Sequence, residues 1–171
     1  MTPRPTKLAL VAVLGLTAAA FAVVARFQLT GNLETDELAP ILWLLTALFA
    51  VRVAGQVLVA LRSPAWLPPM EDWNLVPYRM LLPIQLAIFG VMIWIDASFS
   101  SSTGPAVDTS EWLGWFLIGF SAVYAAAMAV RYVVRMRQRP QTRWFGGTIP
   151  IVFHLVLATY LYALGSFHVG S

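Results

Sequence analysis

The stretch LALVAVLGLTAAAFAVVA, residues 8–25, contains no charged residue and has almost the length at which a helix crosses a bilayer. Four further apolar stretches follow it, at residues 38–61, 80–95, 112–130 and 148–169. A hydrocarbon core about 30 Å thick needs about 20 apolar residues, and backbone groups in lipid must find their hydrogen bonds within their own segment. The pattern therefore predicts an all-α, polytopic integral membrane protein, a bundle of five transmembrane helices.

The composition agrees with this class. Hydrophobic residues make up 59% of the 171 residues and charged residues 11%, where soluble domains carry about 25% charged residues. A transmembrane β-barrel would show alternating segments of about 10 residues instead of unbroken apolar runs. There is no cysteine, which excludes thiolate catalysis and cysteine-held metal centres. We expect a single membrane domain, residues 1–171, with helices at about 8–27, 38–61, 78–97, 111–135 and 148–168.

Charged residues between the stretches predict an orientation. Basic residues precede the first stretch and follow the second and the fourth: Arg4, Lys7, Arg62, Arg79, and the arginines of residues 135–143. The other side holds Arg26 and the acidic residues Glu34, Asp36, Glu37, Asp96, Asp108 and Glu111. Because basic residues in short loops stay cytoplasmic, we expect the N-terminus in the cytoplasm and the C-terminus outside.

The same features predict where the protein resides. The first stretch is longer than the apolar region of a signal peptide, about 7–15 residues, so we expect it to be retained as a helix. The arginine-rich composition favours a bacterial source. We therefore expect a multi-pass protein of the bacterial cytoplasmic membrane.

Arg52 is the most unusual residue of the chain. It lies about ten residues, or about 15 Å, from the inner end of the second stretch. A charge at such depth costs at least about 2.5–3.5 kcal/mol, so it needs a partner or a wet cavity. Gln56, Gln85 and His154 fall at similar depth on three helices, and Arg131 lies nearer the inner surface with Tyr124 deeper. We expect a polar site in the inner half of the bundle.

The proline-rich connection at residues 63–77 is the predicted cap of this site. Trp66 and Trp73 give it an amphipathic character, and its prolines exclude a regular helix. We expect an ordered segment against the inner mouth of the bundle; a plain interfacial loop is the alternative.

Two roles for Arg52 stay open. In the structural one, the connection folds inward and Glu71 or Asp72 pairs with Arg52, Arg62 or Arg79. We expect no carboxylate in the helix interiors and place Asp96 at a helix end. In the functional one, Arg52 faces a cavity for an anionic or carbonyl-bearing ligand, such as a lipid headgroup, a quinone or a small carboxylate.

The leading functional hypothesis is a non-enzymatic membrane subunit or a lipid-binding bundle. No catalytic residue is predicted, and the candidate ligand-binding residues are Arg52, Gln56, Gln85, His154, Trp66, Trp73, Glu71 and Asp72. We expect membrane lipids as partners and no nucleic acid, and we leave open a homo-oligomer or a larger membrane complex.

Two alternatives follow. The first is a redox subunit associated with haem or quinone, with His154 as a ligand or hydrogen-bond donor. His168 lies about 21 Å further along a helix, so it could not share a metal with His154, and we expect it at the membrane interface. No other metal site is predicted. The second is a small transporter, placed last because no membrane-embedded carboxylate is expected to relay protons.

Small residues recur at four-residue spacing, for example Gly15 and Ala19 in the first stretch and Ala122 and Ala126 in the fourth. Such spacing lets helices approach closely, so we expect these faces to support tight packing.

Overall fold

The computed structural model describes residues 4–30, 34–62, 78–138 and 149–170. Within these ranges the chain forms five helices and no strand. They are α1 (Arg4–Thr30), α2 (Thr35–Arg62), α3 (Tyr78–Ser101), α4 (Glu111–Gln138) and α5 (Ile149–Gly170). Each covers one predicted apolar stretch and contains a segment of 20 to 28 residues that is long and apolar enough to cross a membrane. Five such helices indicate a multi-pass membrane protein.

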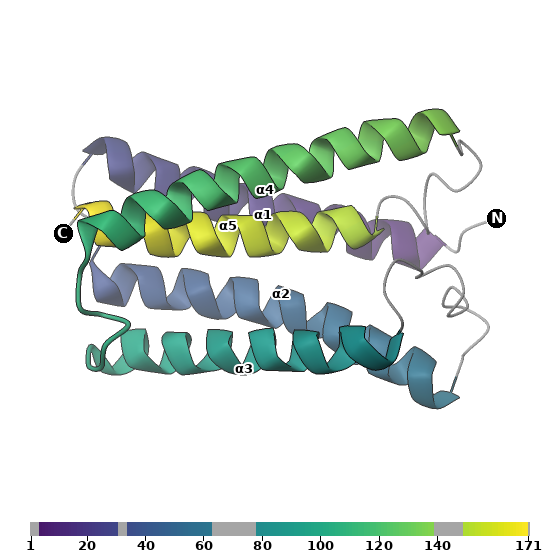
Figure 1. Cartoon of the computed structure of the whole chain (residues 1–171), viewed down its shortest axis with the longest axis horizontal. Coiled ribbons are helices and arrows are strands. Elements are labelled where there is room, and N and C mark those ends of the chain that lie inside the picture. The colour runs from purple at the N-terminus through teal and green to yellow at the C-terminus, as the bar shows by residue number, and fades with distance from the viewer. Residues whose placement is uncertain (1–3, 31–33, 63–77, 139–148, 171) are drawn as a thin grey trace.

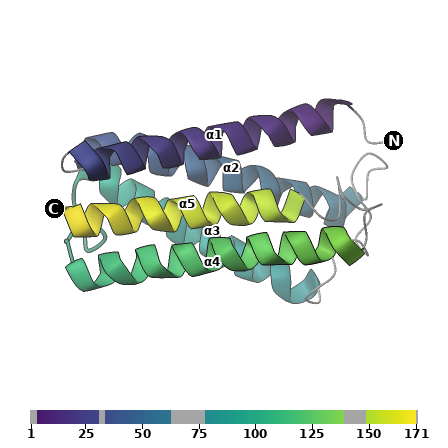
Figure 2. The same ribbon diagram turned by 90° about the horizontal axis from the view of Figure 1, so that it is seen from above.

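The helices run along the long axis of the molecule, with α5 at the centre (Figures 1 and 2). α5 packs against α4, α1 and α2, whereas α3 packs mainly against α2. This arrangement explains why 67% of the span in α5 is buried inside the protein but only 11% of the span in α4. α4 therefore leaves most of its apolar surface to its surroundings.

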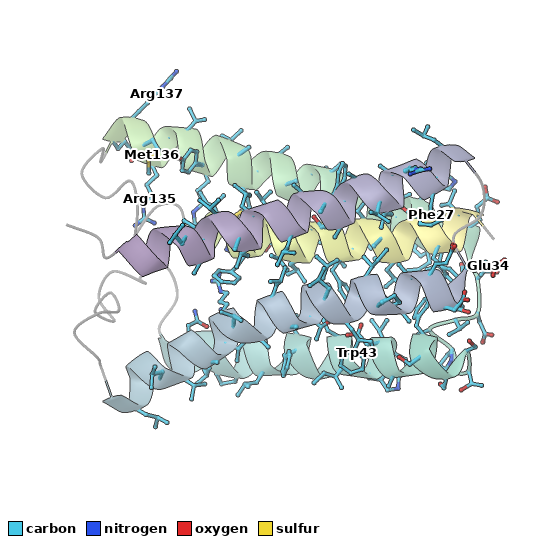
Figure 3. The ribbon with its side chains drawn as sticks, turned by 180° about the vertical axis from the view of Figure 1, so that it is seen from behind. Phe27, Glu34, Trp43, Arg135, Met136 and Arg137 are labelled. Atoms are coloured by element: carbon cyan, nitrogen blue, oxygen red, sulfur yellow. The ribbon has the colours of Figure 1, made fainter. Side chains whose placement is uncertain are left out.

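The two ends of the bundle differ in charge. Arg135 and Arg137 lie at one end, where α4 ends and α1 begins, and Glu34 lies at the other (Figures 1 and 3). The helix order places Asp36, Glu37, Asp108 and Glu111 at the same end as Glu34, together with Arg26. We call these the basic end and the acidic end.

The buried face of α2 explains how Arg52 enters the bundle. Leu42, Leu45 and Phe49 are buried core residues at helical spacing. Arg52 and Gln56 continue the same face toward the basic end. The packing that fixes the apolar part of this face therefore also directs the two polar side chains inward.

α4 and α5 approach closely at two glycines near the acidic end. A Cβ atom added at Gly114 would lie 2.6 Å from a Val169 methyl carbon and 2.9 Å from the Gly165 carbonyl oxygen. One added at Gly165 would lie 2.9 Å from the Gly114 carbonyl oxygen. No side chain fits between the two backbones here. His168, expected at the interface, is instead buried beside this contact, where its Nδ1 accepts the Ser110 N–H at 3.3 Å.

The predicted small-residue faces lie elsewhere. Gly15, Ala19, Ala122 and Ala126 are exposed, and a Cβ atom added at Gly15 would meet nothing within 4 Å. The prediction that these faces pack tightly within the chain is wrong. Spacing alone identifies a smooth helix face but does not tell which way that face is turned.

Candidate functional site

Arg52 of α2 is the first component of the site. Its side chain is 9% exposed, and its guanidinium carbon lies 5.8 Å from the centroid of the Phe153 ring of α5. This distance is within the range of a cation–π contact. Gln56, one turn toward the basic end, is 1% exposed. α2 thus presents a cation and an amide to the interior of the bundle.

The second component is a hydrogen-bonded pair from α4 and α5. The Tyr124 hydroxyl and Nδ1 of His154 share a hydrogen bond, and the two rings meet edge-on with centroids 5.6 Å apart. Both side chains are half-buried. A hydrogen bond at Nδ1 fixes the orientation of the imidazole and leaves Nε2 as the nitrogen that could contact another group.

Tyr124 is also the last of four aromatic rings stacked along α4. Trp112, Phe116, Phe120 and Tyr124 follow one another with centroid distances of 5.7, 6.2 and 6.0 Å. The first three are exposed, which suits a helix face in lipid. The ladder ends where the Tyr124 hydroxyl turns inward to His154.

Arg131 of α4 is the third component. It is half-buried and lies two turns beyond Tyr124. Arg52 and Arg131 both act electrostatically on Tyr124 and His154, and Arg131 also acts on Arg52. The charges of two guanidinium groups from different helices therefore both act on one tyrosine–histidine pair. The described carboxylates lie at the acidic end or, in the case of Asp96, in the half of the bundle nearer that end. The described part of this site is therefore positively charged.

Gln85 of α3 enters the same half of the bundle. Its side chain is 5% exposed, and its Oε1 has no hydrogen-bond partner among the described residues. The structure thus brings Arg52 against Phe153, the residue before His154, puts Gln56 on the same face as Arg52, and buries Gln85 in the same half of the bundle. The predicted cap residues Trp66, Glu71, Asp72 and Trp73 lie outside the described residues, so their roles stay predictions.

Asp96 requires a correction. The expectation that the helix interiors contain no carboxylate is wrong, because Asp96 is 0% exposed and lies within the span of α3. Its Oδ1 accepts a hydrogen bond of 2.9 Å from the hydroxyl of Tyr160 on α5. The predicted helix end at residue 97 was too early, since α3 continues to Ser101.

Serine hydroxyls explain why the helix continues. Ser98, Ser100 and Ser101 each donate to the carbonyl oxygen four residues earlier, at 3.0, 2.8 and 3.0 Å. Hydroxyls satisfied in this way are compatible with a helix in an apolar environment. The polar sequence SFSS therefore belongs to the helix and not to a loop, which is the signal that would have placed Asp96 inside.

In the described part of the chain, no group of three or more histidine and carboxylate side chains could hold a metal ion. Comparisons with protein-family models, with curated proteins and with solved structures found no match to this chain. The arrangement of polar groups inside the bundle therefore carries the functional argument.

Proposed function

We propose that the chain is a non-enzymatic multi-pass membrane protein that binds an anionic or carbonyl-bearing, lipid-like ligand between α2, α4 and α5. The observation that supports this proposal is that the charges of Arg52 and Arg131 both act on the Tyr124–His154 pair. Guanidinium groups donate in a fork that matches carboxylate and phosphate oxygens, and tyrosine and histidine add neutral donors.

The electrostatics favour a ligand with negative charge. Each of the two guanidinium groups raises the energy of the other, and in a membrane span a single such charge costs about 2.5–3.5 kcal/mol. An anionic headgroup would lower both the repulsion between the guanidinium groups and the cost of placing their charges in the span. A quinone-type carbonyl would accept hydrogen bonds from the same donors without removing the repulsion, so the anionic ligand is the stronger candidate.

The charge difference between the two ends supports an orientation with the basic end in the cytoplasm. In this orientation the N-terminus is cytoplasmic, and the ligand lies in the cytoplasmic leaflet of what we infer to be a bacterial inner membrane. A headgroup at the depth of Arg131 would have its acyl chains along the exposed apolar face of α4.

A probe-binding experiment tests the proposal. The purified protein is titrated with a short-chain phosphatidylglycerol and, separately, with a short-chain quinone, and the thermal midpoint Tm is followed. A probe at about 100 times its Kd stabilises the folded state by about 2.7 kcal/mol. We expect phosphatidylglycerol to raise Tm in wild type and to raise it far less in Arg52→Gln and Arg131→Gln.

Arg137→Gln is the matched control, because Arg137 is exposed at the basic end and carries the same charge. It should respond as wild type does. Equal Tm shifts in all four proteins would contradict a site at Arg52 and Arg131 and leave only surface attraction of the probe. A Tm shift with the quinone alone would indicate a carbonyl-bearing ligand instead of an anionic one.

A second candidate is a haem-associated subunit. The hydrogen bond at Nδ1 of His154 supports it, because an imidazole that ligates a metal through Nε2 is usually held in this way at its other nitrogen. Absorption spectroscopy of protein purified from cells supplied with haem tests this candidate. A Soret band lost in His154→Ala and retained in His168→Ala would support it, and absence of the band would reject it.

A further inference from the structure

Three buried polar side chains from three helices meet in the half of the bundle nearer the acidic end. Asp96 of α3 is 0% exposed, and Thr46 of α2 and Tyr160 of α5 are each 2% exposed. Thr46 precedes Arg52 by six residues and Tyr160 follows His154 by six, which is about 9 Å along each helix. The cluster is therefore separate from the site proposed above.

The hydrogen bonds of this cluster are incomplete. The Tyr160 hydroxyl lies 2.9 Å from Asp96 Oδ1 and 3.3 Å from the carbonyl oxygen of Met92. The Thr46 hydroxyl acts on the same carboxyl group, but without the geometry of a full hydrogen bond. Asp96 Oδ2 and Thr46 Oγ1 are both buried and have no hydrogen-bond partner among the described residues. One proton or cation held between these two oxygen atoms would satisfy both.

The charge of the carboxyl group is also left unbalanced. Of the described groups that act on Asp96, α2 contributes the Thr46 hydroxyl and α5 the Tyr160 hydroxyl, and neither is a cation. On α2 the charged residues nearest to Thr46 in the sequence are Arg52, six positions away, and Glu37, nine positions away at the exposed acidic end. A carboxylate without a positive charge is very costly in an apolar interior. One unit of positive charge would balance it.

We propose that Asp96 is the centre of a site for one monovalent cation, taken up either as a proton on Oδ2 or as Na⁺ bound by the surrounding oxygen atoms. Asp96 Oδ2 and Thr46 Oγ1 are hard oxygen donors of the kind that alkali and alkaline-earth cations prefer. A single carboxylate matches a single charge, whereas Ca²⁺ takes six to eight oxygen ligands and usually more than one carboxylate.

The site has a functional consequence. Ionisable residues within membrane spans mark ion pathways and proton relays. The buried carboxyl group removes the reason for which transport was placed last among the hypotheses. The site does not depend on the ligand proposed for the basic half, because its three side chains are all distinct from Arg52, Arg131, Tyr124 and His154.

Two measurements on the full chain in detergent separate the two cations. In the first, Tm is recorded against NaCl concentration with choline chloride keeping the ionic strength constant. In the second, infrared spectra are recorded against pH to detect the C=O stretch of a protonated carboxyl group. Wild type is compared with Asp96→Asn, which keeps the shape of the side chain, and with Asp108→Asn, which removes an exposed carboxylate at the same end.

A saturable rise of Tm with Na⁺, seen in wild type and Asp108→Asn but not in Asp96→Asn, supports the sodium form. A protonated-carboxyl band at neutral pH, present in wild type and Asp108→Asn but absent from Asp96→Asn, supports the proton form. If wild type shows neither the sodium response nor the band, the proposal is overturned.

Thr46→Val gives a second test if Asp96→Asn does not fold. The valine has nearly the shape of threonine and lacks only the hydroxyl oxygen. In the sodium form its Kd for Na⁺ should be weaker by roughly tenfold, a loss of about 1.4 kcal/mol. In the proton form its carboxyl band should shift in frequency, because the hydroxyl beside Oδ2 is gone. An unchanged Kd and an unchanged band would overturn the assignment of Thr46.

Discussion

Tyr124 on α4 and His154 on α5 are joined by a hydrogen bond between the phenol hydroxyl and Nδ1, and their rings meet edge-on. The contact lies in the basic half, while Gly114 and Gly165 bring the same two helices together near the acidic end. Between them Ser121 donates to the Ala158 carbonyl oxygen at 2.8 Å. α4 is thus held to α5 from Gly114 to Tyr124, although little of its surface is buried.

The first prediction concerns the Tyr124 hydroxyl. Tyr124→Phe keeps the ring contact with His154 and removes the hydrogen bond, so we expect a loss of about 0.5–1.5 kcal/mol in the free energy of unfolding. Because the imidazole is no longer oriented, the Tm rise with phosphatidylglycerol should also shrink. Tyr132→Phe, the same change on the same helix, is the control. If both variants respond alike, the Tyr124–His154 bond contributes neither stability nor binding.

The second prediction concerns the close approach of α4 and α5. Gly114→Ala places a methyl group 2.9 Å from a backbone oxygen, which cannot move without displacing the helix. We expect destabilisation of about 1–3 kcal/mol, the usual cost of overpacking. Gly119→Ala on the same helix meets nothing within 4 Å and should be neutral or stabilising by up to about 1 kcal/mol.

Unfolding in a denaturing detergent, followed by circular dichroism, gives both values for the glycine variants. The expected order of stability is Gly119→Ala, then wild type, then Gly114→Ala. The reverse order would mean that the two backbones do not approach as closely in the membrane.

The third prediction concerns the donor to the buried carboxyl group. Tyr160→Phe leaves Asp96 Oδ1 buried without its donor, so we expect a loss of about 1–3 kcal/mol in the free energy of unfolding. Tyr162→Phe is the control on the same helix. Its hydroxyl donates to Gln28 at 2.5 Å in an exposed position, where water can replace the bond at small cost. Equal losses of unfolding free energy in a detergent titration would show that the buried hydrogen bond to Asp96 contributes no more stability than the exposed one to Gln28.

The fourth prediction tests the orientation. The chain has no cysteine, so single cysteines can be introduced without removing others. Asp108→Cys and Gln138→Cys lie at exposed positions of the acidic and basic ends. In intact cells a membrane-impermeant maleimide should label Asp108→Cys only, and after lysis it should label both. Labelling of Gln138→Cys alone in intact cells would reverse the orientation.

The five helices could be predicted because the length of an apolar run is set by bilayer thickness and needs no knowledge of packing. Arg52 and Gln56 could be placed in the interior for a related reason, since a buried charge or amide is costly in lipid and must turn inward. His154 followed from the same argument. These predictions rest on single residues and on depth along a helix.

Some of the predictions that were wrong depend on how a helix is rotated about its axis, and others on where a helix ends. Almost every side of α1 and α4 is apolar, so the sequence gives little indication of which face meets the bundle, and Gly15 and Ala122 were assigned to packing faces although they are exposed. Asp96 was placed at a helix end because SFSS resembles a loop. His168 was expected at the interface because it lies at the end of its apolar stretch, yet its side chain is buried and its Nδ1 accepts the backbone N–H of Ser110.

Among the described helices, α4 packs almost only against α5. Any change in the position of α5 relative to α2 would therefore carry Arg131, Tyr124 and His154 together. Arg52 belongs to α2, on the other side of the contact between α2 and α5. A slide of the α4–α5 pair along α2 by a fraction of a helical turn would leave the tyrosine–histidine bond intact and change the gap between the two guanidinium groups, so the register of these helices would set the width of the proposed ligand site.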